Sequence, residues 1–124
     1  MENKKKILVI DNDRAFTILI NKFFTDVCGY EVEIVPDGYN GIISAGKNNP
    51  GVILLDIRMP AMNGLGVLEK LKFDEKTAHI PVIVLTGFDD EEVKNKALAL
   101  KAADYLAKPL DLEELRRRVE MVIK

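Results

Sequence analysis

The sequence predicts an α/β protein in which five parallel strands form one doubly wound sheet with helices on both faces. Three observations support this prediction. Short apolar runs alternate five times with segments that repeat hydrophobic residues at helical spacing. Two of the runs, residues 52–55 and 80–86, are apolar over nearly their whole length, which is typical of strands buried on both faces. The loops between the runs are short, as βα units with right-handed crossovers require.

The first three elements follow from local patterns. Residues 6–10 are an apolar run and should form the first strand. A helix follows, with Asp13 available as its N-cap and Gly29 at its end. Residues 31–35 alternate apolar and charged side chains, which predicts an edge strand. The apolar stripe expected on the first helix consists of Phe16, Leu19, Ile20, Phe23, Phe24 and Val27.

The later elements are predicted in the same way. Asp37-Gly38 turns the chain into a second helix over about residues 39–47, which the breaker cluster at residues 48–51 closes. The third strand carries Asp56 at its C-terminal end. The remaining elements are expected as a helix around residues 67–71, a strand at 80–86, a helix at 90–100, a short strand at 105–107 and a helix at 110–123.

Composition narrows the possible functions. The 124 residues suit one compact domain, expected to span residues 1–124, and 48% of them are hydrophobic. The net charge of -2, with both signs interspersed, gives no electrostatic footprint for direct binding of nucleic acid. A single cysteine, Cys28, excludes an internal disulfide framework and suits a reducing cytosol. Because no apolar segment approaches the length of a membrane span, we expect a cytoplasmic protein without membrane insertion.

Chemically distinctive residues follow the expected strands. Asp11-Asn12-Asp13 comes after the first strand, Asp56 ends the third, and Lys108 comes after the last. The carboxyl ends of parallel strands meet at the edge where α/β proteins build their sites. Acids, an acceptor carboxylate and a lysine should therefore converge there, which predicts a pocket for phosphoryl transfer.

Four motifs in the right order resemble those of the receiver domain of two-component response regulators. They are the acids at residues 11–13, Asp56-x-x-Met59-Pro60-x-Met62-Asn63-Gly64, Thr86-Gly87 and Lys108-Pro109. The resemblance runs from the first strand to the last helix. It implies the flavodoxin-like (βα)5 receiver fold and a phosphoaccepting signalling domain, not an enzyme. The end of the sequence just past the fifth helix fits both a stand-alone regulator, which a docking partner would read, and a receiver cut from a longer chain.

The resemblance assigns roles to the residues at the strand ends. Asp56 would be the phosphoacceptor, taking a phosphoryl group from a sensor histidine kinase or a histidine phosphotransfer protein. Lys108 would pair with Asp56 and then with the phosphoryl group, and Thr86 would donate its hydroxyl to that group. Tyr105 matches the aromatic switch of the family, although a plain strand aromatic is nearly as good an account. Pro109 matches a proline that follows a cis peptide bond.

The resemblance also implies a Mg²⁺ site made by Asp11, Asn12, Asp56 and the backbone carbonyl of Arg58. The sequence departs from the family here, because receivers usually have two adjacent acids after the first strand. Asn12 can offer an amide oxygen but no charge. We therefore expect either weaker Mg²⁺ binding or a shifted site in which Asp13 takes part. A role of Asp13 as a helix N-cap explains this residue equally well.

Signalling in the family uses the surface of the fourth helix, fifth strand and fifth helix. A downstream effector protein would dock on that face, and the domain would be a monomer or a weak dimer. Ile18 lies off the buried stripe of the first helix and is a candidate contact for the kinase. Lys101 stands where the family commonly has glycine, so a left-handed backbone there would strain it.

Two rival functions also fit parts of the sequence. Residues 7–10 followed by Asp11-Asn12-Asp13 also fit the first motif of phosphatases of the haloacid dehalogenase type. That interpretation leaves the motif around Asp56 and the Lys108-Pro109 pair unexplained. The second rival is a pseudo-receiver that binds partners without being phosphorylated, and Asn12 is its only support. The receiver function accounts for more of the sequence and is the one predicted.

Overall fold

The computed structural model describes residues 4–58, 63–87 and 91–124. Five parallel strands form one sheet in the order β2-β1-β3-β4-β5, so the chain begins in the interior of the sheet and winds outward in both directions. This confirms the predicted doubly wound fold. The strands are β1 (Lys6–Ile10), β2 (Glu31–Val35), β3 (Val52–Asp56), β4 (Val82–Thr86) and β5 (Asp104–Ala107).

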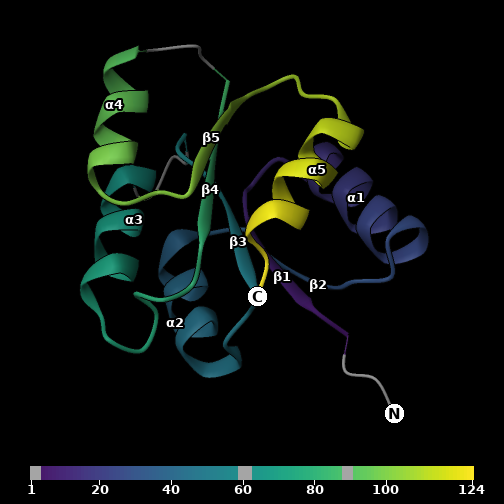
Figure 1. Cartoon of the computed structure of the whole chain (residues 1–124), viewed down its shortest axis with the longest axis horizontal. Coiled ribbons are helices and arrows are strands. Elements are labelled where there is room, and N and C mark those ends of the chain that lie inside the picture. Colours follow the sequence, from purple (N-terminus) through teal and green to yellow (C-terminus); the bar gives the residue numbers. More distant parts are fainter. Residues whose placement is uncertain (1–3, 59–62, 88–90) are drawn as a thin grey trace.

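Helices cover both faces of the sheet (Figure 1). One face is covered by α1 and α5, and the other by α2, α3 and α4. The bounds are α1 (Arg14–Lys22), continued by the π-helix η1 (Phe23–Val27), α2 (Gly38–Asn48), α3 (Gly64–Phe73), α4 (Glu91–Ala99) and α5 (Leu112–Val122). None of the helices in the described part of the chain is long and apolar enough to cross a membrane.

The strands divide their side chains between two hydrophobic clusters because successive residues point to opposite faces. Leu8, Ile53 and Val84 belong to the cluster beneath α2, α3 and α4. Their neighbours Val9 and Leu54 belong to the cluster beneath α1 and α5. All residues of β3 and β4 are buried, as their apolar runs predict, whereas β2 is a partly exposed edge strand. Asp56 therefore ends a fully buried central strand.

The first helix differs from its prediction. Ile20 and Phe24 are fully buried as expected, but Leu19 is 50% exposed and Val27 is 58% exposed. The chain leaves α-helical geometry at η1, where the Cys28 N–H donates to the Phe23 carbonyl five residues earlier. Val27 therefore rotates out of a stripe that was predicted on the α-helical period. Leu19 lies at the margin of the buried face.

The end of α4 has the backbone conformation predicted for Lys101. Its φ is 73°, in the left-handed region. The Lys101 N–H donates to the Leu98 carbonyl and the Ala102 N–H to the Ala97 carbonyl, each at 3.0 Å. These two bonds form a Schellman motif, in which the left-handed position is most often glycine. A lysine is thus held in a conformation that its Cβ disfavours.

Candidate functional site

Three polar residues at the C-terminal ends of the central strands are buried. Asp11 directly follows β1, Asp56 ends β3 and Thr86 ends β4. The parallel register pairs Ile10 with Leu55 and Asp56 with Leu85, so these strand ends lie at the same edge of the sheet. The prediction that the acids converge at this edge is confirmed for Asp11 and Asp56, which both contact one lysine.

That lysine is Lys108, whose side chain is only 16% exposed. Its Nζ lies 2.7 Å from Oδ2 of Asp11 and 3.8 Å from Oδ2 of Asp56. The predicted pair with Asp56 is therefore present, but the shorter contact goes to Asp11. The Lys108 N–H donates to the Thr86 carbonyl at 2.6 Å, and the Lys108–Pro109 peptide bond is cis, as the resemblance implied.

Both oxygens of Asp11 are engaged. Its Oδ1 accepts the backbone N–H of Asp13 at 2.9 Å, and its Oδ2 accepts Lys108. Asp56 uses Oδ1 to accept the backbone N–H of Arg58 at 3.1 Å. The carboxylates are thus oriented by the first residues of their own loops. Local backbone geometry, and not long-range packing alone, sets the directions in which they point.

The electrostatics of the site favour an additional cation. Burial raises the pKa of Asp56 above its ordinary value of 3.8, and the negative charge of Asp11 raises it further. The hydrogen bond from the Arg58 N–H and the charge of Lys108 act in the opposite direction without cancelling the rise. Two buried carboxylates share one ammonium group, so the pocket carries an excess of negative charge.

The donor set fits a hard divalent cation. Carboxylate, amide and carbonyl oxygens are the ligands that Mg²⁺ prefers. Asp11 and Asp56 supply the two buried carboxylates, while Asn12 and Arg58, which follow them in the sequence by one and two residues, are exposed. Within the described ranges, no group of three or more His, Cys, Asp and Glu side chains could hold a metal ion. Among the described residues, the negative charge at the site therefore comes from two carboxylates unless Asp13 joins them.

Asp13 is confirmed as the N-cap of α1. Its Oδ1 accepts the backbone N–H of Phe16 at 3.2 Å, and its backbone has the extended conformation of a cap residue. This leaves one carboxylate oxygen for any further role. A part in metal binding stays a prediction. The neighbouring Ile18 is 63% exposed, as expected for a residue off the buried stripe, and it lines a hollow with Asp11 and Asn12.

The structure adds a contact that sequence reasoning missed. The Nζ of Lys108 lies 4.2 Å from the centre of the Phe16 ring on α1. Phe16 was predicted only as a member of the apolar stripe. Its spacing along the helix identifies it as a core residue, and nothing in the sequence reveals which cation lies over its face.

Tyr105 is half-buried on β5, opposite Val84 of β4, and packs against the cluster beneath α2, α3 and α4. Next to it in sequence, Asp104 accepts two hydrogen bonds from Arg118 of α5, at 2.8 and 2.7 Å. Arg118 also donates to Glu114 at 2.9 Å. Sequence reasoning did not foresee this link between β5 and α5, because it joins residues on separate elements.

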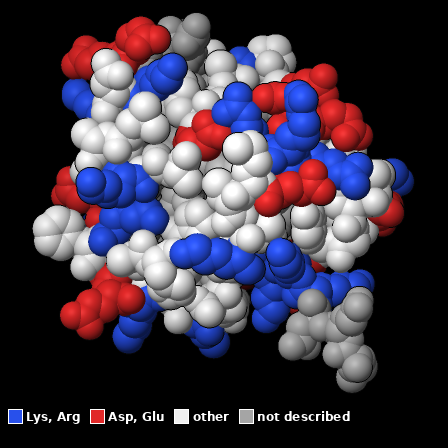
Figure 2. All heavy atoms as spheres, in the orientation of Figure 1, with Lys and Arg blue, Asp and Glu red and all other residues white. Residues whose placement is uncertain are grey.

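Acids neighbour the arginines of α5. Arg116 pairs with Glu113 at 3.7 Å and with Glu120 at 3.8 Å, and Arg117 pairs with Glu114. Figure 2 shows blue and red side chains intermingled over this region of the molecule. The arginine run is therefore neutralised by its own helix and does not form a basic patch.

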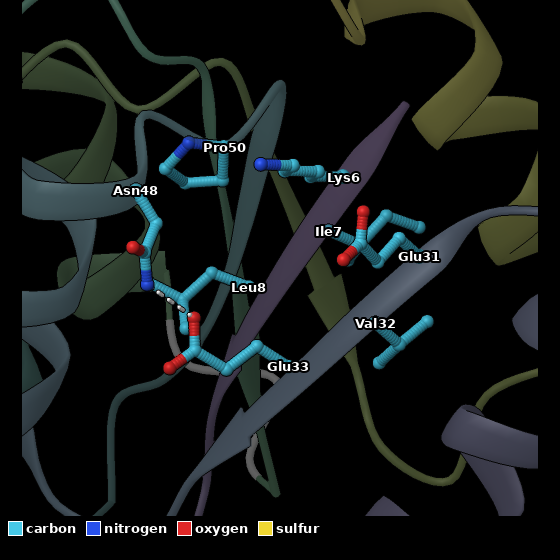
Figure 3. A pocket seen from close by; sticks show the side chains of 8 residues that line it. All are labelled: Lys6, Ile7, Leu8, Glu31, Val32, Glu33, Asn48 and Pro50. Atoms are coloured by element: carbon cyan, nitrogen blue, oxygen red, sulfur yellow. Dashed lines mark hydrogen bonds between the residues drawn. The ribbon is translucent and has the colours of Figure 1, made fainter. Parts of the chain in front are cut away.

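Another hollow lies at the opposite end of the strands (Figure 3). It is lined by Lys6, Ile7, Leu8, Glu31, Val32, Glu33, Asn48 and Pro50. Glu33 accepts hydrogen bonds there from Asn48 at 3.1 Å and from Ser44 at 2.6 Å. None of the predicted site residues lines this hollow. Met59, Pro60 and Met62 of the quoted motif lie outside the described residues.

A sequence profile described as the response regulator receiver domain matches residues 7–120. The chain belongs to this family. It is a receiver domain of the kind found in two-component response regulators. Receiver domains are signalling domains that interact with histidine kinases. Membership decides between the receiver and phosphatase interpretations in favour of the receiver.

Curated relatives of this receiver domain are longer proteins. The DNA-binding dual master transcriptional regulator RpaA of Synechocystis is 36% identical over 119 residues, which is 96% of this chain and 49% of RpaA. The response regulator PleD of Caulobacter vibrioides is 37% identical over 119 residues, which is 96% of this chain and 26% of PleD. The chain thus spans half or less of the length of these relatives.

Solved structures share the fold of this receiver domain over its whole length. The chemotaxis protein CheY4 of Vibrio cholerae has a TM-score of 0.91 and 27% identity, covering 98% of this chain and 100% of CheY4. The receiver domain of the sensor histidine kinase PA1611 of Pseudomonas aeruginosa has a TM-score of 0.87 and 27% identity, covering 97% of this chain and 98% of its own. That structure contains a magnesium ion coordinated in its active site cleft.

Proposed function

We propose that residues 1–124 form a single receiver domain in which Asp56 accepts a phosphoryl group in a Mg²⁺-dependent reaction. One observation carries the proposal. The carboxylate of Asp56 is buried at the end of the central strand, beside Asp11 and within 3.8 Å of the Lys108 ammonium. A buried carboxylate flanked by a second acid and a lysine is costly to a fold and useful for phosphoryl transfer.

The transfer step follows from the placement of these groups. A carboxylate oxygen of Asp56 forms a new P–O bond while the P–N bond to the imidazole of a donor phosphohistidine breaks. The electron pair of that bond goes to the imidazole nitrogen, which leaves with the donor protein. Lys108 offsets the charge that gathers on the phosphoryl oxygens. Thr86, buried at the end of β4, donates its hydroxyl to one of them.

Asp11, Asn12, Asp56 and the Arg58 carbonyl would hold Mg²⁺ in this proposal. When bound, the ion supplies positive charge that the two carboxylates and the incoming phosphoryl group share. Asn12 contributes an oxygen without charge, so the affinity for Mg²⁺ should be lower than with an acid at this position. Asp13 is the residue available to compensate, through the oxygen that does not cap α1.

Phosphorylation would be read out on the face formed by α4, β5 and α5. Thr86 and Tyr105 would act as the switch, with Tyr105 turning inward as Thr86 moves toward the phosphoryl group. We expect the partners to be a sensor histidine kinase or a histidine phosphotransfer protein and a downstream effector protein. The domain itself would be a cytoplasmic monomer or weak dimer that neither contacts nucleic acid nor enters a membrane.

The test is incubation with acetyl phosphate, with and without Mg²⁺, followed by intact mass measurement. We expect the wild-type chain to gain the mass of one phosphoryl group only when Mg²⁺ is present. Asp56→Ala should abolish the gain, and Asp26→Ala, at an exposed position on η1, should leave it unchanged. A folded wild-type chain that gains no mass at any Mg²⁺ concentration would favour the pseudo-receiver. In that case Asn12→Asp is the first substitution to make.

A further inference from the structure

The ammonium group of Lys108 has neighbours on three separate elements. Asp11 follows β1 and lies 2.7 Å from Nζ, and Asp56 ends β3 and lies 3.8 Å away. The third neighbour is the ring of Phe16 on α1, whose centre lies 4.2 Å from Nζ. An ammonium within about 6 Å of a ring centre is attracted by the negative face of the ring. Phe16 is thus part of the electrostatic surroundings of the lysine.

Two hydrogen bonds from backbone N–H groups to carboxylate oxygens connect the Phe16 backbone to Asp13 and Asp13 to Asp11. The Asp13 N–H donates to Oδ1 of Asp11 at 2.9 Å, and the Phe16 N–H donates to Oδ1 of Asp13 at 3.2 Å. The loop that orients Asp11 therefore also fixes the first turn of α1. As a consequence, the Phe16 backbone is held close to the Asp11 carboxylate, and the side chains of both residues contact Lys108.

We propose that Phe16 is a positioning residue that holds the Lys108 ammonium where a phosphoryl group on Asp56 will meet it. The inference rests on the proposed function of Asp56. It goes beyond it, because it assigns part of the control over Lys108 to an uncharged residue of α1 that was predicted only as a core residue.

The need for such a residue follows from competition for the carboxylates. Asp11 and Asp56 each have one oxygen facing Lys108, and the same two carboxylates are the proposed ligands of Mg²⁺. A cation bound by them weakens their hold on the ammonium. The ring of Phe16 is no ligand for Mg²⁺, so its attraction for Lys108 persists when the carboxylates are engaged. Because Lys108 is 16% exposed, water screens this attraction only in part.

The experiment compares variants in the full chain. Phe16→Leu keeps an apolar side chain but removes the aromatic face, whereas Phe16→Tyr keeps the face. Phe23→Leu is the matched control, since Phe23 is half-buried in the same cluster and packs edge-on against Phe24. Each variant is phosphorylated with acetyl phosphate at saturating Mg²⁺. In a separate NMR measurement, the shifts of the Lys108 ε-methylene protons report whether they lie over a ring.

We expect Phe16→Leu to slow phosphorylation about three- to tenfold, the factor that corresponds to loss of one partly desolvated cation–π contact. Phe16→Tyr and Phe23→Leu should stay within about twofold of wild type on the same scale. The ε-methylene protons should be shifted upfield in wild type and Phe16→Tyr, and should lose that shift in Phe16→Leu.

Three results of the rate measurement would overturn the inference. These are a wild-type rate in Phe16→Leu, an equal loss in Phe16→Tyr, and an equal loss in Phe23→Leu, since the last two point to packing. An ε-methylene shift that is unchanged in Phe16→Leu would also overturn it. Failure of the proposed function looks different, because the wild-type chain itself would then gain no phosphoryl group.

Discussion

Gly64 is expected to be the least replaceable glycine near the site. It is the first residue of α3, and its N–H donates to the Ile57 carbonyl at 3.0 Å, which ties the start of the helix to the residue after Asp56. A Cβ built on Gly64 would lie 2.7 Å from the Asp56 carbonyl oxygen and still closer to Cα of Ile57. Ordinary contacts of a Cβ begin at 3.4 Å, so α3 would have to retreat by about 0.7 Å to relieve the contact with the oxygen, and further to relieve the contact with Ile57.

Gly66 provides the matched control. It lies on the same helix two residues later, is exposed, and has nothing within 4 Å of an added Cβ. Alanine at a helix-interior glycine is expected to stabilise by about 0.5–1 kcal/mol. Overpacking against backbone costs about 1–3 kcal/mol, because neither the β3 end nor the helix can rotate away as a flexible side chain would. Gly64→Ala should therefore be less stable than Gly66→Ala by about 1.5–4 kcal/mol, which is the cost at Gly64 added to the gain at Gly66.

The assay is urea unfolding followed by circular dichroism, together with the rate of phosphorylation by acetyl phosphate. We expect Gly64→Ala to lower both the free energy of unfolding and the rate, since the clash displaces the backbone that carries Asp56 and the Arg58 carbonyl. Gly66→Ala should leave the rate unchanged. If the two variants unfold with equal free energies, the reasoning from close approach of α3 to β3 is wrong.

Three more outcomes are expected. Lys101→Gly should raise the free energy of unfolding by up to about 1 kcal/mol, because it removes the Cβ at φ 73°. Lys101→Ala keeps the Cβ and should not raise it. Equal effects of the two substitutions in urea unfolding would show that backbone strain is not the cause. Asn12→Asp should tighten Mg²⁺ binding about tenfold or more by adding a charge beside the site, which calorimetric titration would measure; unchanged affinity would place the ion elsewhere. Asp56→Asn should stabilise the fold at neutral pH. A raised folded-state pKa means that Asp56 favours folding below its ordinary value of 3.8 and opposes it as pH rises through the folded value. The increase in the free energy of unfolding caused by Asp56→Asn, measured by urea unfolding, should therefore be smaller at acidic pH. An increase that does not depend on pH would contradict this.

Much of the fold follows from short-range patterns in the sequence. The bounds of β1, β2 and β3 agree with the predicted ranges because each apolar or alternating run ends at a polar residue or a turn. β4 begins at Val82, two residues late, since the Ile80 N–H is used in a turn with the Thr77 carbonyl. α5 begins at Leu112 because Asp111 is its N-cap and accepts the Glu113 N–H.

The π-helix after α1 was missed for a physical reason. The spacing of hydrophobic residues indicates which side chains are buried, and the positions of Phe23 and Phe24 are compatible with both an α-helix and a π-helix. Whether the α-helix or the π-helix forms depends on where Gly29, with φ 76°, must end the helix so that the chain can enter β2. Such a constraint comes from the distance between helix end and strand, which no local pattern encodes.

For the candidate site too, sequence patterns predicted some features, and others depend on packing. Which residues reach the pocket was predictable, because parallel strands place their C-terminal ends together and the motifs sit at those ends. The pair of Lys108 with Asp56 was predicted as well, but the closer contact of Lys108 with Asp11 was not. Lys108 approaches Asp11 more closely than Asp56 because the Asp13 N–H turns the Asp11 carboxylate, and its contact with Phe16 depends on the packing of α1. These are angular details of loops and helix packing.

The double hydrogen bond between Arg118 and Asp104 has a mechanical consequence. It anchors the middle of α5 to the first residue of β5, immediately before Tyr105. A displacement of α5 by a bound protein is therefore transmitted to the strand that carries Tyr105. The two elements should therefore move together when a partner binds, and because the Arg118–Asp104 pair is partly buried, high salt should weaken this coupling only in part.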